Sequence, residues 1–336
     1  MNSRTHRSLK GFTLVELLVV IGIIALLISI LLPSLYNARR AAYVVVCCSQ
    51  LRQIGAAMME YSEEYNGSIP GCGWTSGAFL LYPPPGTKYS ETHCPNICQT
   101  WDWMSPIATE MGYTFDVGPT VADRTARLDY LCRLPVFHCP ENDLPWPPYG
   151  GTITITTQAP SYVTASMFLY EYKATAQPGD PDLTQSYIQE PGYSPKIQNV
   201  GVASEKIFMA EGTRWCNSNN SPPNYDDGID GDNRSPGGSF ADFGPWSLYT
   251  RAYYRVMPNT TVPITYSMRH GTKVAGASLS AYRFNAVFFD GHAETLDGRT
   301  GMNPRLWMPK GSILPGSECS AEAKSIYMTT DPLIIP

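Results

Sequence analysis

Charged residues are scarce in this chain, and runs of basic residues are absent. Asp, Glu, Lys and Arg make up 16% of the 336 residues, and the formal net charge is -5 at pH 7. A chain that is acidic and lacks clusters of Lys and Arg is a poor partner for nucleic acid. We therefore expect no nucleic acid among its partners.

The sequence also lacks the short motifs of common catalytic sites. It contains no glycine-rich phosphate-binding loop, no Gly-x-Ser-x-Gly nucleophile turn and no His-Glu-x-x-His zinc-protease motif. We therefore expect a protein that is not an enzyme and requires no cofactor.

Turn-forming and aromatic residues, by contrast, are plentiful. The chain has 29 Pro, 28 Gly and 21 Tyr, and 43% of its residues are apolar or aromatic. This composition is too apolar for a disordered chain and indicates a folded domain with many turns.

One long apolar run follows a short basic leader. Between Phe12 and Leu32, Glu16 is the single charged side chain. As a helix rising about 1.5 Å per residue, this run is about 31 Å long, close to the hydrocarbon thickness of a bilayer. Residues 12–32 are therefore predicted to span a membrane. The basic residues of the leader, residues 1–11, place the rest of the chain outside the cytoplasm.

Glu16 is unusual in this setting, because a carboxylate inside a membrane helix is costly and normally has a partner. The alternative is that Glu16 lies at the level of the lipid headgroups, five residues into the apolar run.

Residues 10–18, KGFTLVELL, resemble the leader and first helix of type IV prepilins and of the pseudopilins of type II secretion. The resemblance implies that a prepilin peptidase cleaves after Gly11 and that Phe12 becomes the N-methylated first residue. It also implies that Glu16 pairs with the terminal amine of a sister subunit in the filament core. Such a pair is consistent physically, since opposite charges offset each other's burial cost only when both are present. A plain signal anchor is the alternative.

The helix is predicted to continue beyond Pro33, which should kink it rather than end it. Apolar residues then recur in steps of three and four, which is typical of an amphipathic helix; they are Val44, Cys48, Leu51, Ile54, Met58, Tyr61 and Tyr65. Asn66 and Gly67 form a plausible stop. Residues 33–66 are thus predicted to form the amphipathic second half of one bent helix.

Two further segments resemble a large bacterial group of pilin-like proteins that carry a C-terminal processing-associated domain. These are residues 48–55, CSQLRQIG, and residues 137–143, FHCPEND. Gln50 departs from the Asn usual in that group. The group also has a strand that ends in Glu-Gly, which corresponds to Glu211 and Gly212.

Residues 67–336 are predicted to form a loop-rich α+β domain, with an antiparallel sheet packed on the long helix in a pilin-like fold. Alternating or continuous apolar residues indicate strands at 152–157, 161–170, 206–211 and 284–289, and a short helix is expected near 107–113.

The C-terminal region 265–298 contains a histidine and an Asp-Gly-His sequence, which resemble the signature of the same group with about ten extra residues between them. Asp290 and Gly291 predict a two-residue hairpin turn between strands 284–289 and 292–296. His270, Asp290 and His292 are suitable ligands for a transition metal, but a structural role is expected first. Glu211 and His138 are further candidates for a site in space.

Nine cysteines suit an exported protein with disulfides, and the odd number leaves at least one outside intramolecular pairs. Cys94 with Cys98, and Cys132 with Cys139, are the closest pairs that are not adjacent. The alternative is a zinc site built from these four residues and His138.

An acidic, glycine-rich stretch lies within residues 217–244. Closely spaced oxygen ligands suit Ca²⁺, and the candidates are Asp226, Asp227, Asp230 and Asp232. The spacing is not that of an EF-hand, so a solvated acidic turn is favoured over a calcium site.

The sequence as a whole predicts a structural subunit, which is inserted in the inner membrane and then assembled through its N-terminal helix into a pilus or a type II secretion-like pseudopilus. Its expected partners are sister subunits, the prepilin peptidase, the assembly platform and the membrane. The alternative is an extracytoplasmic binding protein or metal-dependent hydrolase that uses the helix only as an anchor.

Overall fold

The computed structural model describes residues 13–72, 102–115, 121–142, 160–170, 192–212, 241–247, 252–254, 266–272, 274 and 277–336. The chain divides into two compact units, Met1–Tyr43 and Val44–Pro336.

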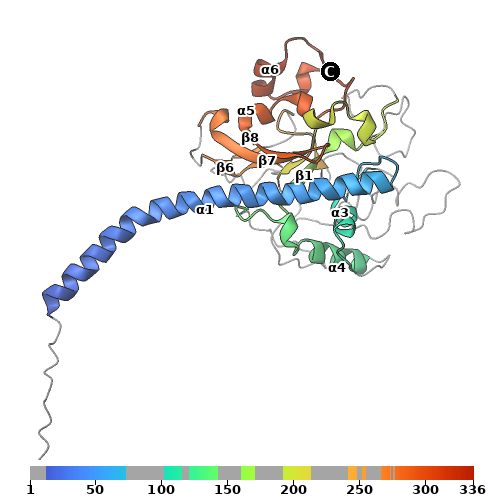
Figure 1. Ribbon diagram of the computed structural model, residues 1–336. Helices are drawn as coiled ribbons and strands as arrows, with labels where there is room; N and C mark the ends of the chain where they lie inside the picture. Colours follow the sequence, from blue (N-terminus) through green and yellow to red (C-terminus); the bar gives the residue numbers. More distant parts are fainter. Residues whose placement is uncertain are drawn as a thin grey trace, which may run out of the picture. The chain divides into compact units, whose positions relative to one another are not determined.

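The helix α1 runs from Leu14 to Glu64 without interruption and passes through Pro33 (Figure 1). The prediction of one continuous helix through this proline is confirmed. Asn66 follows it with a positive φ of 55°, and Gly67 has a φ of 80°, which is the left-handed backbone that commonly ends a helix.

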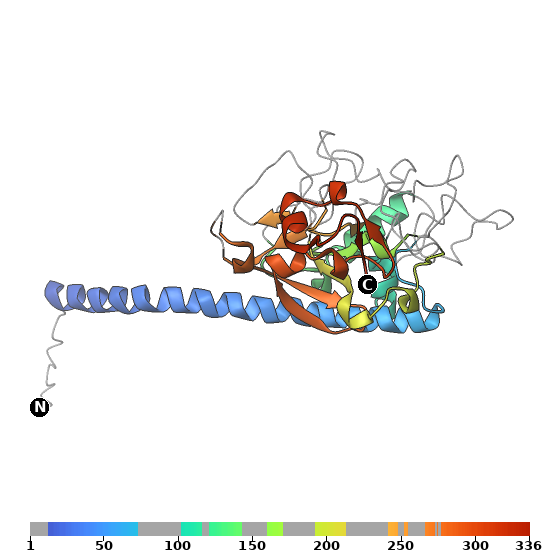
Figure 2. The same cartoon turned by 90° about the horizontal axis from the view of Figure 1, so that it is seen from above.

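Within the second unit, one face of α1 is buried, and most of the predicted apolar stripe lies on it. Leu51, Ile54 and Met58 are fully buried. Gly55 lies on the same face and leaves no space for a side chain. A Cβ at this position would be 2.6 Å from Cγ2 of Val287 and 3.1 Å from the carbonyl oxygen of Gly291. A glycine therefore lets the helix approach the sheet closely, as Figures 1 and 2 show for this part of α1.

The main sheet has six strands in the described part of the chain, in the order β3-β1-β2-β7-β6, with β8 also paired to β7. The strands are β1 (Tyr162–Ala165), β2 (Ile207–Glu211), β3 (Ala241–Asp242), β6 (His270–Gly271), β7 (Tyr282–Phe288) and β8 (Ala293–Asp297). All pairs are antiparallel except β1 with β3. The predicted α+β fold with a largely antiparallel sheet is confirmed.

The described part of the second unit also contains smaller elements. The helices are α3 (Met104–Glu110), α4 (Val121–Leu131), α5 (Gly298–Gly301) and α6 (Ala321–Tyr327). Two short strand pairs join β4 (Ala252–Tyr254) to β5 (Tyr266–Met268), and β9 (Ile313–Leu314) to β10 (Leu333–Ile334). The predicted strands at 206–211 and 284–289 correspond to β2 and β7. The prediction at 161–170 was too long, because β1 ends at Ala165, and residues 152–157 lie outside the described residues.

The β7–β8 hairpin differs from the prediction in its turn. Val287 pairs with Ala293, and the N–H of Phe288 donates to the carbonyl of His292 at 2.9 Å, which leaves a three-residue loop at 289–291. Only Gly291 in this loop has a positive φ, of 84°. A two-residue type I′ turn needs two such residues, so Asp290 and Gly291 do not form one.

Candidate functional site

The described residues of the first unit, 13–43, present an apolar helix surface that none of these residues covers. The large side chains of α1 from Leu14 to Leu35 are exposed to between 44% and 77%. They lie on all sides of the helix, and α1 contains a stretch long and apolar enough to cross a membrane. Such a surface requires lipid or other apolar helices around it.

Glu16 closes the first turn of α1 through a capping box with Thr13. The Glu16 carboxylate accepts hydrogen bonds from the backbone N–H of Thr13 at 2.9 Å and from its hydroxyl at 2.8 Å, and the Thr13 hydroxyl accepts from the N–H of Glu16 at 3.3 Å. This reciprocal arrangement satisfies two N–H groups that the helix leaves without partners. The sequence Thr-x-x-Glu carries this signal, which the sequence reasoning missed. Gly11 and Phe12 lie outside the described residues.

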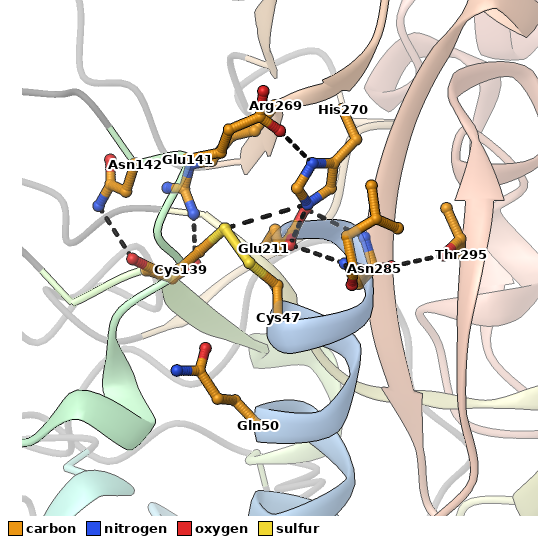
Figure 3. Close-up of polar contacts among 12 residues, drawn as sticks. Cys47, Gln50, Cys139, Glu141, Asn142, Glu211, Arg269, His270, Asn285 and Thr295 are labelled. Atoms are coloured by element: carbon orange, nitrogen blue, oxygen red, sulfur yellow. Dashed lines mark hydrogen bonds and ion pairs between the residues drawn. A yellow bond between two sulfur atoms is a disulfide. The ribbon is translucent and has the colours of Figure 1, made fainter. Parts of the chain in front are cut away.

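The second unit contains a buried polar cluster, which Figure 3 shows between α1, the segment after α4, and the sheet. Its centre is His270 at the start of β6. Topology brings His270 close to Glu211 because β8 occupies one edge of β7, so β2 and β6 share the other edge. Glu211 ends β2, and His270 begins β6.

Both ring nitrogens of His270 face carboxylates. Nδ1 is hydrogen-bonded to the carboxylate of Glu141, and Nε2 lies 2.8 Å from Oε1 of Glu211. The three side chains are 4% exposed or less. Burial by itself lowers the pKa of His270, but the negative charge of Glu211 and the hydrogen bonds that the ring donates to both carboxylates outweigh it and raise the pKa to about 9. His270 is thus an imidazolium that donates from both nitrogens at neutral pH.

Glu211 also binds β7 and, through it, α1. Its Oε2 accepts from the backbone N–H of Asn285 at 3.1 Å, and its Oε1 accepts from Nδ2 of Asn285 at 3.0 Å. The same Nδ2 donates to the carbonyl of Val44 in α1 at 3.2 Å, while Oδ1 of Asn285 accepts from the Thr295 hydroxyl at 2.6 Å. The network therefore joins α1, β2, β6, β7 and β8 through charged or polar bonds.

Arg269 contributes a second buried cation beside the cluster. Its guanidinium donates to the carbonyl of Ser161 at 2.9 Å and to the carbonyl of Gly212. Ser161 precedes β1 and Gly212 follows β2, so Arg269 joins the ends of these two paired strands beside Glu211. The described side chains of the cluster include two carboxylates, one imidazolium and one guanidinium.

A disulfide joins Cys47 of α1 to Cys139, 92 residues later. Cys139 therefore has a different partner from its near neighbour Cys132. The predicted zinc alternative also loses Cys139, because a disulfide sulfur is not a thiolate ligand. Cys94 and Cys98 lie outside the described residues.

The structure does not bring together the three residues predicted as possible metal ligands. His270 pairs with Arg283 near the start of β7, whereas Asp290 and His292 lie beyond the opposite end of that strand. Asp290 and His292 are partly exposed and contact each other, with Nδ1 of His292 2.5 Å from Oδ1 of Asp290. His138 contacts the carbonyl of Cys132.

The predicted calcium ligands Asp226, Asp227, Asp230 and Asp232 lie outside the described residues. The favoured acidic turn and the alternative calcium site therefore both stay predictions.

Comparison with known proteins points to the N-terminal segment. Residues 7–32 match the model of the prokaryotic N-terminal methylation motif. Over 45 residues the chain is 51% identical to a type IV wide pilus major component, PilA4, of Thermus thermophilus. This region is 13% of the chain and 34% of the relative, so the chain spans about a third of the length of this curated relative. No solved structure matches the chain. The predicted resemblance to type IV prepilins is confirmed for the N-terminal segment.

Proposed function

We propose that this chain, which carries a prepilin-type N-terminal motif, is a structural subunit of a pilus or of a type II secretion-like pseudopilus. Prepilin peptidase removes residues 1–11 by cleavage after Gly11, and Phe12 is then methylated on its new amine. Before assembly, the subunit is inserted in the inner membrane with its second unit outside the cytoplasm. The assembly platform then adds it to sister subunits.

The observation that carries this proposal is the apolar surface of α1 from Leu14 to Leu35, exposed on all sides. Lipid covers such a surface before assembly, and the helices of sister subunits cover it afterwards. Glu16 lies in the first turn of α1 and is exposed in the single chain. In the assembled filament its carboxylate receives the methylated amine of a neighbouring Phe12, which offsets the cost of burying either charge.

The buried cluster of the second unit supports a structural role for that unit. Its central side chains, Glu141, Glu211 and His270, are closed to solvent, so a substrate has no access to them. They connect α1 to the sheet. A subunit that assembles through its N-terminal helix requires such a connection between that helix and the rest of the domain.

Mass spectrometry of the protein recovered from cells tests the proposal. We expect a mature chain that begins with N-methylated Phe12, and we expect Gly11→Leu to leave the full leader in place. Gly22→Ala serves as the matched control, because it alters another glycine of the same segment, where a Cβ meets nothing within 4 Å. A native chain that still begins at Met1 contradicts the proposal and favours an anchored binding protein or hydrolase.

A further inference from the structure

Four buried side chains of the second unit offer the ligand atoms of a zinc site. Cys47, Cys139, Glu211 and His270 contribute two sulfurs, an oxygen and a nitrogen, and these atoms all lie within 4.8 Å of one another. Figure 3 shows the two sulfurs next to the imidazole ring, with Glu211 beneath it. Thiolate, imidazole and carboxylate are the ligand types that proteins use to hold Zn²⁺.

We propose that the chain binds one Zn²⁺ through Cys47, Cys139, Nε2 of His270 and the carboxylate of Glu211 before the disulfide forms. Synthesis delivers both cysteines as thiols, which are metal ligands once they lose their protons. Binding therefore releases three protons, one from each thiol and one from Nε2. The metal takes the place of the Nε2 proton between His270 and Glu211.

The distances in the cluster are close to those of a tetrahedral site. Bonds of about 2.0–2.3 Å to Zn²⁺ place neighbouring ligand atoms roughly 3.3–3.8 Å apart. Nε2 of His270 lies 4.0 Å from Sγ of Cys139 and 2.8 Å from Oε1 of Glu211. Shifts of roughly half an ångström bring these three atoms to that geometry. The two sulfurs separate as soon as they are thiols.

The surroundings of the four ligands match those of a metal site as well. A histidine that binds a metal usually donates its second N–H to a carboxylate, which fixes the ring and its tautomer. Nδ1 of His270 makes this contact with Glu141. Asn285 donates two hydrogen bonds to Glu211 and so holds the second ligand in place.

Bound Zn²⁺ determines which of two adjacent cysteines, Cys47 or Cys48, lies next to Cys139 before oxidation. Cys48 follows Cys47 directly, and its thiol is buried against the carbonyl of Ala293, 3.5 Å away. Zinc held by His270 and Glu211 brings Cys47, not Cys48, to Cys139. An external disulfide then accepts two electrons from the two thiolates and takes up two protons. A third proton returns to Nε2, the Cys47–Cys139 bond forms, and Zn²⁺ leaves.

Refolding of the full chain in detergent tests the proposal. The chain is unfolded in a denaturant that contains a phosphine reductant, which converts its cysteines to thiols. It is then refolded without oxygen in the presence of Zn²⁺. Bound metal is counted after gel filtration, and X-ray absorption at the zinc edge identifies its neighbours. We expect one Zn²⁺ with two sulfur and two nitrogen or oxygen neighbours, and we expect an added disulfide oxidant to release it as two thiols disappear.

Variants assign the metal to these residues. We expect Cys139→Ser and His270→Gln to abolish this binding, and Glu141→Ala to weaken it by about 10–100-fold. Cys48→Ser is the matched control and should retain one Zn²⁺. A zinc shell of four sulfurs, equal binding by Cys139→Ser, or zinc that stays bound after the Cys47–Cys139 bond forms would each overturn the proposal. The absorption spectrum of the unaltered chain decides the matter even where a variant fails to fold.

Discussion

A rise in pH is expected to destabilise the second unit of the disulfide-bonded protein through His270. The pKa of this residue is about 9 in the folded chain, against an ordinary value of 6.5. Because the folded pKa is the higher one, the stabilisation is complete below pH 6.5 and is lost as the pH rises through about 9. At about 1.4 kcal/mol for each pH unit, the imidazolium contributes about 3 kcal/mol in total.

Lys206 changes the free energy of unfolding in the opposite direction as the pH rises. It therefore limits the pH range in which the effect of His270 can be measured alone. Burial, partly offset by the charge of Glu205, lowers its pKa from 10.5 to about 8. Its loss of a proton in the folded state therefore adds stability above about pH 8. Between about pH 6 and pH 8, where Lys206 contributes little, His270 alone should lower the free energy of unfolding by about 2 kcal/mol.

Urea unfolding at a series of pH values measures this effect. The fluorescence of Trp103, Trp246 and Trp307 reports on the second unit, since all three side chains are fully buried there. We expect the free energy of unfolding to fall in the unaltered protein and to stay level in His270→Gln over the same range. Equal slopes in the two proteins, or a level profile in the unaltered one, would refute the reasoning.

Three further predictions concern α1 and its attachment. Glu16→Gln keeps an acceptor for the helix cap and removes only the charge, so we expect normal membrane insertion without assembly; filaments in electron micrographs would show that the cap suffices. Gly55→Ala should lower the free energy of unfolding by about 1–2 kcal/mol because its Cβ would lie 2.6 Å from Cγ2 of Val287. Gly22→Ala should leave the same urea transition unchanged. Cys139→Ser should cost about 4 kcal/mol, since it removes a link across 92 residues; an unchanged midpoint would argue against that link.

Features that depend on neighbouring residues were predictable from the sequence. The apolar run and the stripe through Leu51, Ile54 and Met58 define α1, because helical periodicity depends on residues three and four apart. The β7–β8 pair follows from two apolar segments that flank Asp290 and Gly291. Only the loop length was wrong, because a three-residue loop needs a single left-handed residue where the prediction required two.

The buried cluster could not be predicted, because its members come from distant parts of the chain. Glu211 and His270 were each noticed, but their contact arises from the way β2 and β6 share one edge of β7. Glu141 lies 129 residues from His270, and no periodicity connects them. The bond between Cys47 and Cys139 was missed for the same reason, since proximity in sequence favoured Cys132.

The position of Cys47 gives the molecule a mechanical property. The boundary between the two units falls between Tyr43 and Val44, and Cys47 lies one turn further along the same helix. A pull on the N-terminal part of α1 therefore reaches a covalent anchor within one turn of entering the second unit. The disulfide passes this load to the segment around Cys139, so tension along the helix is borne by a covalent bond as well as by side-chain packing.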